Sequence, residues 1–506
     1  MMNDNLLVLP ILIPFLTGIV GLLAWKNIGL QRIISVIGSA ALLLVSLILF
    51  SWVRVSGIQS TRMGSWPAPF GIILVCDLLS AILVILAGIV GLAVMVYSMA
   101  AIDRKREAFG YYPLLNILLM GVCGAFLTGD LFNLYVWFEV MLMASFVLLE
   151  LGGGKKQIEG AVKYVTLNLM SSALFLTGIA LLYGITGSLN MAEISLFLKS
   201  GPSSGLIQAV SMLFFLAFGI KAAVFPLFFW LPESYHTPPA PVSAIFAGLL
   251  TKVGVYAMIR AFTLIFVKEL EQTQTMVLSC AGLTMVAGAL GAVSKMEFRR
   301  ILSFNLVSHV GYMVMGLGLY TLLSITGAIF YFMHHMITIT NLFLISGLVR
   351  LMKGSYELKP LGGIYRDFPL FSFLFLISAL ALAGVPPLSG FWAKLILIKA
   401  GILEARYAMV GAALLVSLLT LYSMVIIWNE AFWKDPPGTG HLQHGEPMMI
   451  QNREVVIMML PIILLSGLNI FIGIFPEGFF NCFQAAAEQL MNPSEYVRVV
   501  LGRGGL

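Results

Sequence analysis

Long apolar segments recur along the whole chain, and short polar segments separate them. A helix needs about 20 apolar residues to cross the hydrocarbon layer of a membrane. None of the segments shows the two-residue alternation of a transmembrane β-strand. The pattern therefore predicts an all-α polytopic membrane protein with about fourteen transmembrane helices, over residues 6–24, 32–53, 72–99, 111–128, 131–150, 159–184, 205–231, 241–266, 273–294, 301–320, 324–350, 369–400, 406–429 and 454–475.

Composition agrees with a chain that lies mostly in lipid. Of the 506 residues, 60% are hydrophobic and only 10% are charged, whereas a soluble globular chain has about 25% charged residues. This excludes a cytosolic enzyme, a disordered protein and a secreted disulfide scaffold. The net charge of +6 is scattered, which fits residues flanking a membrane and not a nucleic-acid site. The four cysteines form no CxxC pair, so no metal site is predicted.

Lysine and arginine are concentrated in the loops that follow odd-numbered spans. Cytoplasmic loops carry an excess of these residues, so the positive-inside rule places these loops in the cytoplasm and both termini outside. The longest of them, 430–453, contains His441 and His444. These two histidines could bind a metal ion, but a solvated loop is the expected interpretation.

Several ionisable side chains lie inside the predicted spans, where a charged group is costly. Many stand near mid-span, close to the bilayer centre at 1.5 Å per residue. Such a row at one depth predicts proton relay along the membrane plane, because a buried lysine gives up its proton readily and histidine titrates near neutral pH. The alternative is static polar contacts between helices. The proton-transfer candidates are Glu139, Lys221, Lys252, His309, His334, His335 and Lys394, and Asp77 and Asp130 are candidates for a cation path on the outer side.

Two spans contain helix breakers beside a buried lysine. Pro226 follows the lysine of the seventh span, and Gly384, Pro386 and Pro387 precede the lysine of the twelfth. Proline removes a helix hydrogen bond, and non-helical backbone at this depth persists only inside protein or beside a wet cavity. In transporters, broken helices in matching positions mark the ion site. An ordinary proline kink is the alternative, and the matching pair favours broken helices.

The two breaks lie five spans apart, which indicates two repeats of five helices. An odd number of spans turns the second repeat over relative to the first, as in many transporters. In this register Lys221 corresponds to Lys394 and Glu139 to His309, and each repeat supplies a half-channel to one side. The predicted units are helices one to three in 1–110, the first repeat in 111–266, the second in 273–429, and a cytoplasmic loop, helix fourteen and a C-terminal tail in 430–506.

Three segments carry a family resemblance: LTGDLFNLYVWFEVMLMASF (127–146), FGIKAAVFPLFFWLPESYHTPPAPVSAIFAGLLTKVG (218–254) and AGVPPLSGFWAKL (383–395). They resemble the antiporter-like subunits shared by respiratory complex I and the Mrp-type multisubunit Na⁺/H⁺ antiporters. Within that superfamily the chain is most similar to the Mrp subunits of type D. The resemblance extends from residue 9 to about residue 430.

This resemblance implies a fourteen-helix subunit with inverted repeats and broken seventh and twelfth helices. It also implies that Glu139, Lys221, Lys252 and Lys394 form a central polar axis, in which Glu139 and Lys221 act as a coupled pair. The implied partners are the A-, B-, C-, E-, F- and G-type subunits of an antiporter in a prokaryotic plasma membrane. The implied transported ions are H⁺ and Na⁺ or K⁺, with no bound cofactor.

Helix eleven departs from the pattern of the D-type relatives. His335 matches the histidine of their motif, but Thr340 stands where a lysine is expected, and His334 is additional. Threonine carries no charge, so a relay at this point is expected to use histidines, water or Lys394.

The sequence therefore predicts a transporter and not an enzyme: the proton-translocating subunit of a multisubunit Na⁺(K⁺)/H⁺ antiporter. The chain shows no nucleotide-binding or redox motif, so its energy must come from an ion gradient or from a partner. One alternative is a proton-pumping membrane subunit of a complex I-like oxidoreductase or membrane-bound hydrogenase. The other is a structural subunit whose polar residues only hold helices together.

Overall fold

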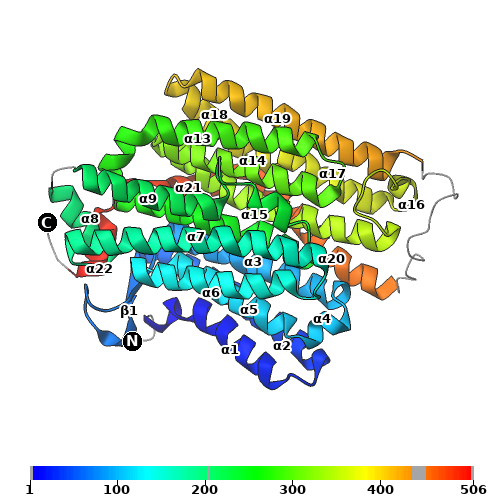
Figure 1. Cartoon of the computed structure of the whole chain (residues 1–506), viewed down its shortest axis with the longest axis horizontal. Helices are drawn as coiled ribbons and strands as arrows, with labels where there is room; N and C mark the ends of the chain where they lie inside the picture. The colour runs from blue at the N-terminus through cyan, green and yellow to red at the C-terminus, as the bar shows by residue number, and fades with distance from the viewer. Residues whose placement is uncertain (1–3, 202–203, 436–451, 503–506) are drawn as a thin grey trace.

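The computed structural model describes residues 4–201, 204–435 and 452–502, and it is almost entirely helical (Figure 1). Eleven of the described helices are long and apolar enough to cross a membrane, and three shorter apolar helices accompany them. The all-α polytopic fold class is confirmed, while the number of fourteen crossings stays a prediction. His441 and His444 lie outside the described residues.

The N-terminal part adds a small antiparallel sheet that the hydropathy pattern did not predict. Its two strands pair from Gln59–Cys76 to Arg62–Ile73. The third long helix begins later than predicted because Asp77 caps it, accepting a hydrogen bond from the Ser80 backbone N–H at 2.9 Å. The elements are η1 (Asp4–Leu7), α1 (Leu9–Leu23), α2 (Ile28–Ser56), β1 (Gln59–Arg62), η2 (Met63–Ser65), β2 (Ile73–Cys76), α3 (Leu78–Ala101) and α4 (Arg104–Ala108).

The next group of helices contains two interruptions. The helix of the seventh span ends at Ala222, and Pro226 lies in the irregular stretch before Trp230, so the predicted break is confirmed. The eighth span contains a π-helical turn, which was not predicted. The elements are α5 (Tyr111–Leu127), α6 (Leu131–Glu150), α7 (Lys155–Thr186), α8 (Met191–Ser200), α9 (Gly205–Ala222), α10 (Trp230–Ser234), α11 (Ala240–Ile245), η3 (Phe246–Leu250) and α12 (Thr251–Leu264).

The following group surrounds one long buried helix, α15 (Leu322–Lys353), which a capping box between Thr321 and Ser324 starts. The twelfth span is broken as predicted, since Gly384 ends α17 at a φ of +91° and Pro386 and Pro387 precede α18. The other elements are α13 (Val267–Val293), α14 (Phe298–Leu319), α16 (Ile364–Asp367), α17 (Pro369–Ala383), α18 (Ser389–Leu403), α19 (Tyr407–Ile427) and η4 (Trp428–Trp433).

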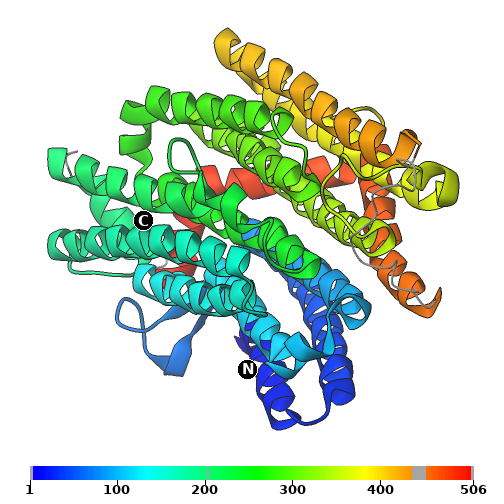
Figure 2. The ribbon, with the colours of Figure 1, turned by 45° about the vertical axis from the view of Figure 1, so that its right-hand side comes forward.

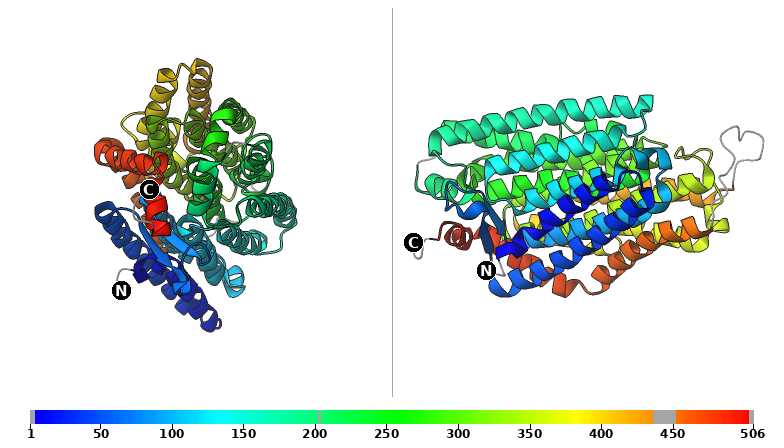
Figure 3. Two further views of the ribbon diagram at one scale, coloured as in Figure 1. Left: turned by 90° about the vertical axis from the view of Figure 1, so that its left-hand side faces the viewer. Right: turned by 90° about the horizontal axis from the view of Figure 1, so that it is seen from below.

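The last part is more ordered than the predicted C-terminal tail. After α20 (Asn452–Ile474), the chain forms α21 (Pro476–Met491) and α22 (Ser494–Leu501). These last two helices are too short to give a span signal. The orange-to-red helices α20 and α21 pass between α3 and α15, and both contact them (Figure 2). The first and last described elements, η1 and α22, lie at the same end of the bundle (Figure 3).

Candidate functional site

Glu139 and Lys221 stand near the middle of the first group of helices. Lys221 is at the end of α9, is 7% exposed, and donates a hydrogen bond to Ser172 Oγ at 3.2 Å. Its Nζ lies 4.7 Å from the ring centroid of Phe138. Glu139 is half-buried on α6, and its Oε1 atom is buried without a hydrogen-bond partner among the described residues. The two residues interact electrostatically. Lys221, however, donates its hydrogen bond to Ser172 and not to Glu139, its expected partner.

The other two lysines of the predicted axis are tied to carbonyls at helix interruptions. Lys252 follows the π-helical turn and donates to the carbonyl of Ala247 inside it. Lys394 donates to the carbonyl of Ala383 at 2.9 Å, and Ala383 is the last residue of α17. The last carbonyls of a helix lack partners within the helix and attract positive charge. Each of these two interruptions therefore holds the terminal nitrogen of a buried lysine.

The histidines of α14 and α15 form a stack of rings with two tyrosines. His309 and His335 stack with centroids 5.0 Å apart. The Tyr331 hydroxyl lies 2.7 Å from His309 Nδ1, and Tyr331 stacks on Tyr312 at 5.0 Å. Lys394 Nζ lies 5.2 Å from the Tyr312 ring centroid. The ring series therefore joins the predicted histidines to the predicted lysine.

Sequence reasoning missed both tyrosines of this series. Tyr312 stands three residues after His309, and Tyr331 four residues before His335. Both spacings place the side chains on one face of a helix, which is the signal that was available.

His334 lies beside this stack, with its ring edge-on to Tyr331 at a centroid distance of 5.7 Å. Its Nδ1 lies 2.8 Å from the hydroxyl of Ser389, the first residue of α18. Thr340, at the position of the expected lysine, donates to the Met336 carbonyl at 2.7 Å. A Cβ on Gly248 would collide with the Thr340 hydroxyl, so Thr340 packs directly on the π-helical turn.

Several buried polar atoms of this axis have no hydrogen-bond partner in the part of the chain that the structure describes. A buried polar atom is normally satisfied by protein or by ordered water. A series of unsatisfied proton acceptors and donors is therefore suited to a hydrated proton path. The atoms are Glu139 Oε1, His309 Nε2, His334 Nε2, and both ring nitrogens of His335.

The two residues predicted as cation ligands, Asp77 and Asp130, have different surroundings. Asp77 forms a buried ion pair with Arg260, with 2.6 Å between Asp77 Oδ2 and the Nη1 atom. Asp130 caps α6 by accepting from the Asn133 backbone N–H at 2.7 Å, and burial raises the pKa of Asp130. Arg260 was not connected to Asp77 from the sequence, because the pairing depends on how α3 packs against α12.

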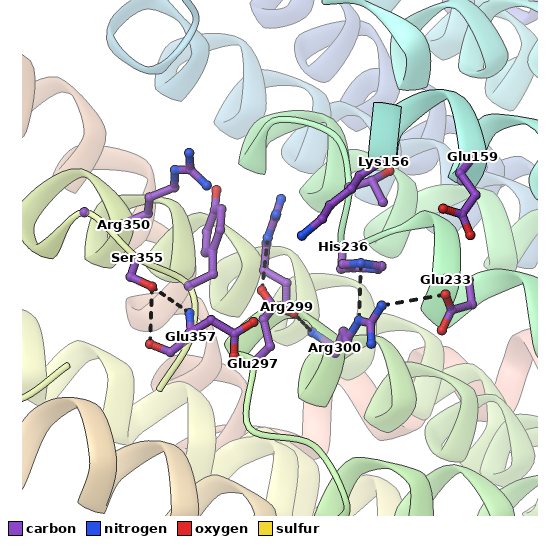
Figure 4. A pocket seen from close by; sticks show the side chains of 14 residues that line it. Lys156, Glu159, Glu233, His236, Glu297, Arg299, Arg300, Arg350, Ser355 and Glu357 are labelled. Carbon is purple, nitrogen blue, oxygen red and sulfur yellow. Dashed lines mark hydrogen bonds and ion pairs between the residues drawn. The ribbon is translucent and has the colours of Figure 1, made fainter. Parts of the chain in front are cut away.

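A polar pocket of about 500 Å³ opens beside α10 (Figure 4), at the end of the bundle where α4 and α16 lie (Figure 1). Arg300 Nε donates to His236 Nε2 at 3.2 Å, and His236 Nδ1 lies 2.7 Å from the Pro232 carbonyl oxygen. Burial, followed by the neighbouring Arg300, lowers the pKa of His236 to about 4. His236 is therefore neutral at pH 7. The lining residues include Lys156, Glu159, Glu233, Glu297, Arg299, Arg350 and Glu357.

A second, smaller cavity lies beside Lys221. It has a volume of about 20 Å³ and is lined by Tyr164, Asn168, Trp230 and Lys221, which is room for about one water molecule. Gly160, on the wall of the larger pocket, is one helical turn before Tyr164 on α7. The two cavities thus follow one another along α7 towards Lys221.

The chain is similar to known proteins over almost its whole length. Residues 128–420 match the family described as NADH:quinone oxidoreductase/Mrp antiporter, TM. The chain is 46% identical over 498 residues to the D-type subunit of the Na(+)/H(+) antiporter of Alkalihalophilus pseudofirmus, covering 98% of this chain and 99% of that one.

Two solved structures share the fold. One is a chain of the Mrp complex from Dietzia sp. DQ12-45-1b, with a TM-score of 0.92 and 30% identity, covering 99% of this chain and 100% of that one. The other is a chain of the membrane-bound sulfane sulfur reductase, an archaeal respiratory membrane complex. Its TM-score is 0.87 at 26% identity, with coverage of 98% and 99%.

Proposed function

Because the chain belongs to the NADH:quinone oxidoreductase/Mrp antiporter transmembrane family, we propose that it is the proton-translocating D-type subunit of a multisubunit Na⁺(K⁺)/H⁺ antiporter. Its partners are the A-, B-, C-, E-, F- and G-type subunits of that complex. It transports H⁺ in exchange for Na⁺ or K⁺ and uses no bound cofactor.

Protons move along the axis in the plane of the membrane. They enter through the pocket beside His236, pass the small cavity to Lys221, and continue by Lys252 and the ring stack to Lys394. The observation that carries this proposal is that buried lysines sit beside helix interruptions, next to buried histidine nitrogens that lack a partner among the described residues. Such groups can each take and pass a proton, whereas static contacts would leave no acceptor free.

The orientation follows from the loop charges. The pocket end of the bundle, with Lys156, Arg299, Arg300 and Arg350, faces the cytoplasm by the positive-inside rule. Both termini then lie outside, in a prokaryotic plasma membrane. In this orientation the pocket is the cytoplasmic entrance.

Exchange in inside-out membrane vesicles that carry the whole complex tests the proposal. Sodium-dependent dissipation of ΔpH is compared between wild type and Lys221→Ala, with co-purification of the subunits as the check on assembly. The matched control is Lys199→Ala, since Lys199 is an exposed lysine on α8. We expect Lys221→Ala to lose about 100-fold or more of the exchange rate, and Lys199→Ala to keep it. An assembled Lys221→Ala complex that exchanges at the wild-type rate contradicts the proposal.

A second candidate function is a proton-pumping membrane subunit of a respiratory or hydrogenase-like complex. The structural likeness to the archaeal respiratory complex favours it. In that case electron-transfer partners supply the energy, and the same axis carries the protons. Wild-type vesicles without any Na⁺- or K⁺-linked exchange would favour this candidate over the antiporter.

A further inference from the structure

A hydrogen-bonded network joins His334 to α20, the helix of the last predicted span. Asn469 on α20 is fully buried, and its Oδ1 atom receives two hydrogen bonds of 2.8 Å. One comes from the hydroxyl of Thr338 and the other from the hydroxyl of Ser389. Both hydroxyl oxygens also lie within reach of His334 Nδ1, at 3.2 Å and 2.8 Å respectively.

The orientation of the Asn469 amide follows from its other contact. Asn469 Nδ2 donates to the Leu465 carbonyl at 3.3 Å. A flipped amide would turn its oxygen towards that carbonyl, placing two acceptors together. The Oδ1 atom therefore faces the two hydroxyls.

This orientation fixes the roles of both hydroxyl groups. A hydroxyl has one hydrogen to donate, and those of Thr338 and Ser389 are both given to Asn469 Oδ1. Neither hydroxyl can then donate to the imidazole, so each accepts from it. Consequently His334 Nδ1 carries the hydrogen, and Nε2 of the neutral ring is an acceptor that has no hydrogen-bond partner within the described part of the chain.

The free Nε2 atom faces the part of α18 that precedes Lys394. A Cβ on Gly390 would lie 2.8 Å from His334 Nε2, and Lys394 stands one helical turn further along α18. The other titratable groups around His334 are Tyr331, whose ring centroid is 5.7 Å away, and His309 and His335, which interact with it electrostatically.

We infer that Asn469 is a positioning residue that holds His334 in the Nδ1–H tautomer, so that Nε2 accepts protons on the Lys394 side. This inference rests on the proposed function, because it assigns His334 a place in that proton path. It also gives α20 a part in proton transfer through an amide that does not itself titrate. His334 thereby supplies a proton acceptor in the helix where Thr340 replaces the expected lysine.

Two substitutions of Asn469 separate this role from simple packing. Asn469→Asp keeps an oxygen that accepts from both hydroxyls, whereas Asn469→Leu removes it and frees the hydroxyls to donate to His334. A packing role predicts that the apolar leucine is tolerated better than a buried carboxylate. The tautomer role predicts the opposite order.

The assay is Na⁺-dependent exchange between pH 6 and pH 9 in inside-out vesicles with the assembled complex. We expect Asn469→Leu to lower exchange about tenfold or more and to displace its pH profile, and Asn469→Asp to retain the larger part of the rate. The matched control is Asn341→Leu, since the buried Asn341 amide donates to Ser378 and Ser466, away from the histidine ring. That variant should keep the wild-type pH profile.

Either of two results overturns the inference: Asn469→Leu exchanging as well as Asn469→Asp, or Asn341→Leu displacing the pH profile equally. If Asn469→Leu does not assemble, the double variant Thr338→Val/Ser389→Ala gives the second measurement. It removes both acceptors of the Nδ1 hydrogen, and an unchanged pH profile again overturns the inference. The Lys221→Ala result separates the two proposals. If Lys221→Ala loses exchange but Asn469→Leu exchanges as well as Asn469→Asp, only this inference is rejected and the proposed function stands.

Discussion

The ion pair between Asp77 and Arg260 gives the most demanding test of how α3 packs against α12. The two side chains are only 3% and 6% exposed, so neither charge can be hydrated if its partner is removed. Breaking a buried pair by removing one partner costs about 3–5 kcal/mol, because the remaining charge stays buried. Asp77→Asn and Arg260→Met should therefore each destabilise the complex by about this amount.

The double variant Asp77→Leu/Arg260→Met should recover most of the loss. Replacing both charges of a buried pair by apolar side chains is often neutral or stabilising. The control is Lys353→Met, which breaks the Lys353–Asp367 pair at 22% and 47% exposure. An ion pair of that kind contributes about 0–1 kcal/mol.

The assay measures how much complex stays assembled after heating in detergent, together with the Na⁺ dependence of exchange in vesicles. The reasoning is refuted if both single variants are as heat-resistant as wild type. If, in addition, Asp77→Asn raises the Na⁺ concentration needed for half-maximal exchange, Asp77 is a cation ligand and not the fixed partner of Arg260.

Three further predictions concern the pocket and the axis. His236 has a pKa of about 4 in the folded chain against about 6.5 unfolded, so stability is full above pH 6.5 and falls by up to about 3 kcal/mol towards pH 4. His236→Gln should remove this loss of stability, which is measured as the difference in heat resistance of the assembled complex between about pH 6.5 and pH 4. An equal difference in the variant and in wild type would contradict the prediction. Gly390→Ala places a Cβ closer to the Ala381 carbonyl oxygen than the contact distance of the two atoms. It should therefore destabilise the fold by about 1–3 kcal/mol or more and reduce the yield of assembled complex. A normal yield would refute the close packing of α18 against α17 at this point. Tyr331→Phe removes the hydroxyl at His309, so it should cost about 1 kcal/mol and slow exchange in vesicles, and an unaltered exchange rate would take this tyrosine out of the path.

The broken helices could be predicted because their signal is local. Pro226 and the pair Pro386 and Pro387 interrupt apolar segments directly beside a lysine, and no tertiary information is needed to see this. The lysines could be predicted as well, because the rise per residue of a helix gives the distance of each lysine from the end of its span.

The partners of these residues could not be predicted in the same way. That Lys221 bonds to Ser172, and that Arg260 pairs with Asp77, depends on which helices are neighbours and how they are rotated. The hydropathy pattern also does not predict the two last helices, α21 and α22, because short helices with polar faces contain no long apolar segment. The contacts of Asn469 could not be predicted either, because a single asparagine in an apolar span does not indicate which side chains it meets.

The π-helical turn η3 has a consequence for how this chain tolerates changes in length. A π-helical turn holds one more residue than an α-helical turn, and each residue advances an α-helix by about 100°. Deleting one residue within 246–250 would let the helix run through regularly and would leave the rotation of α12 relative to α11 nearly unchanged, because the wider π-helical turn accommodates its extra residue within the turn. Lys252 would then keep its direction, but the widened turn whose Ala247 carbonyl accepts its hydrogen bond would be lost. A one-residue deletion at this place therefore removes the carbonyl site of Lys252 while keeping the orientation of the helix, whereas the same deletion in a regular part of the span would rotate everything after it by about 100°.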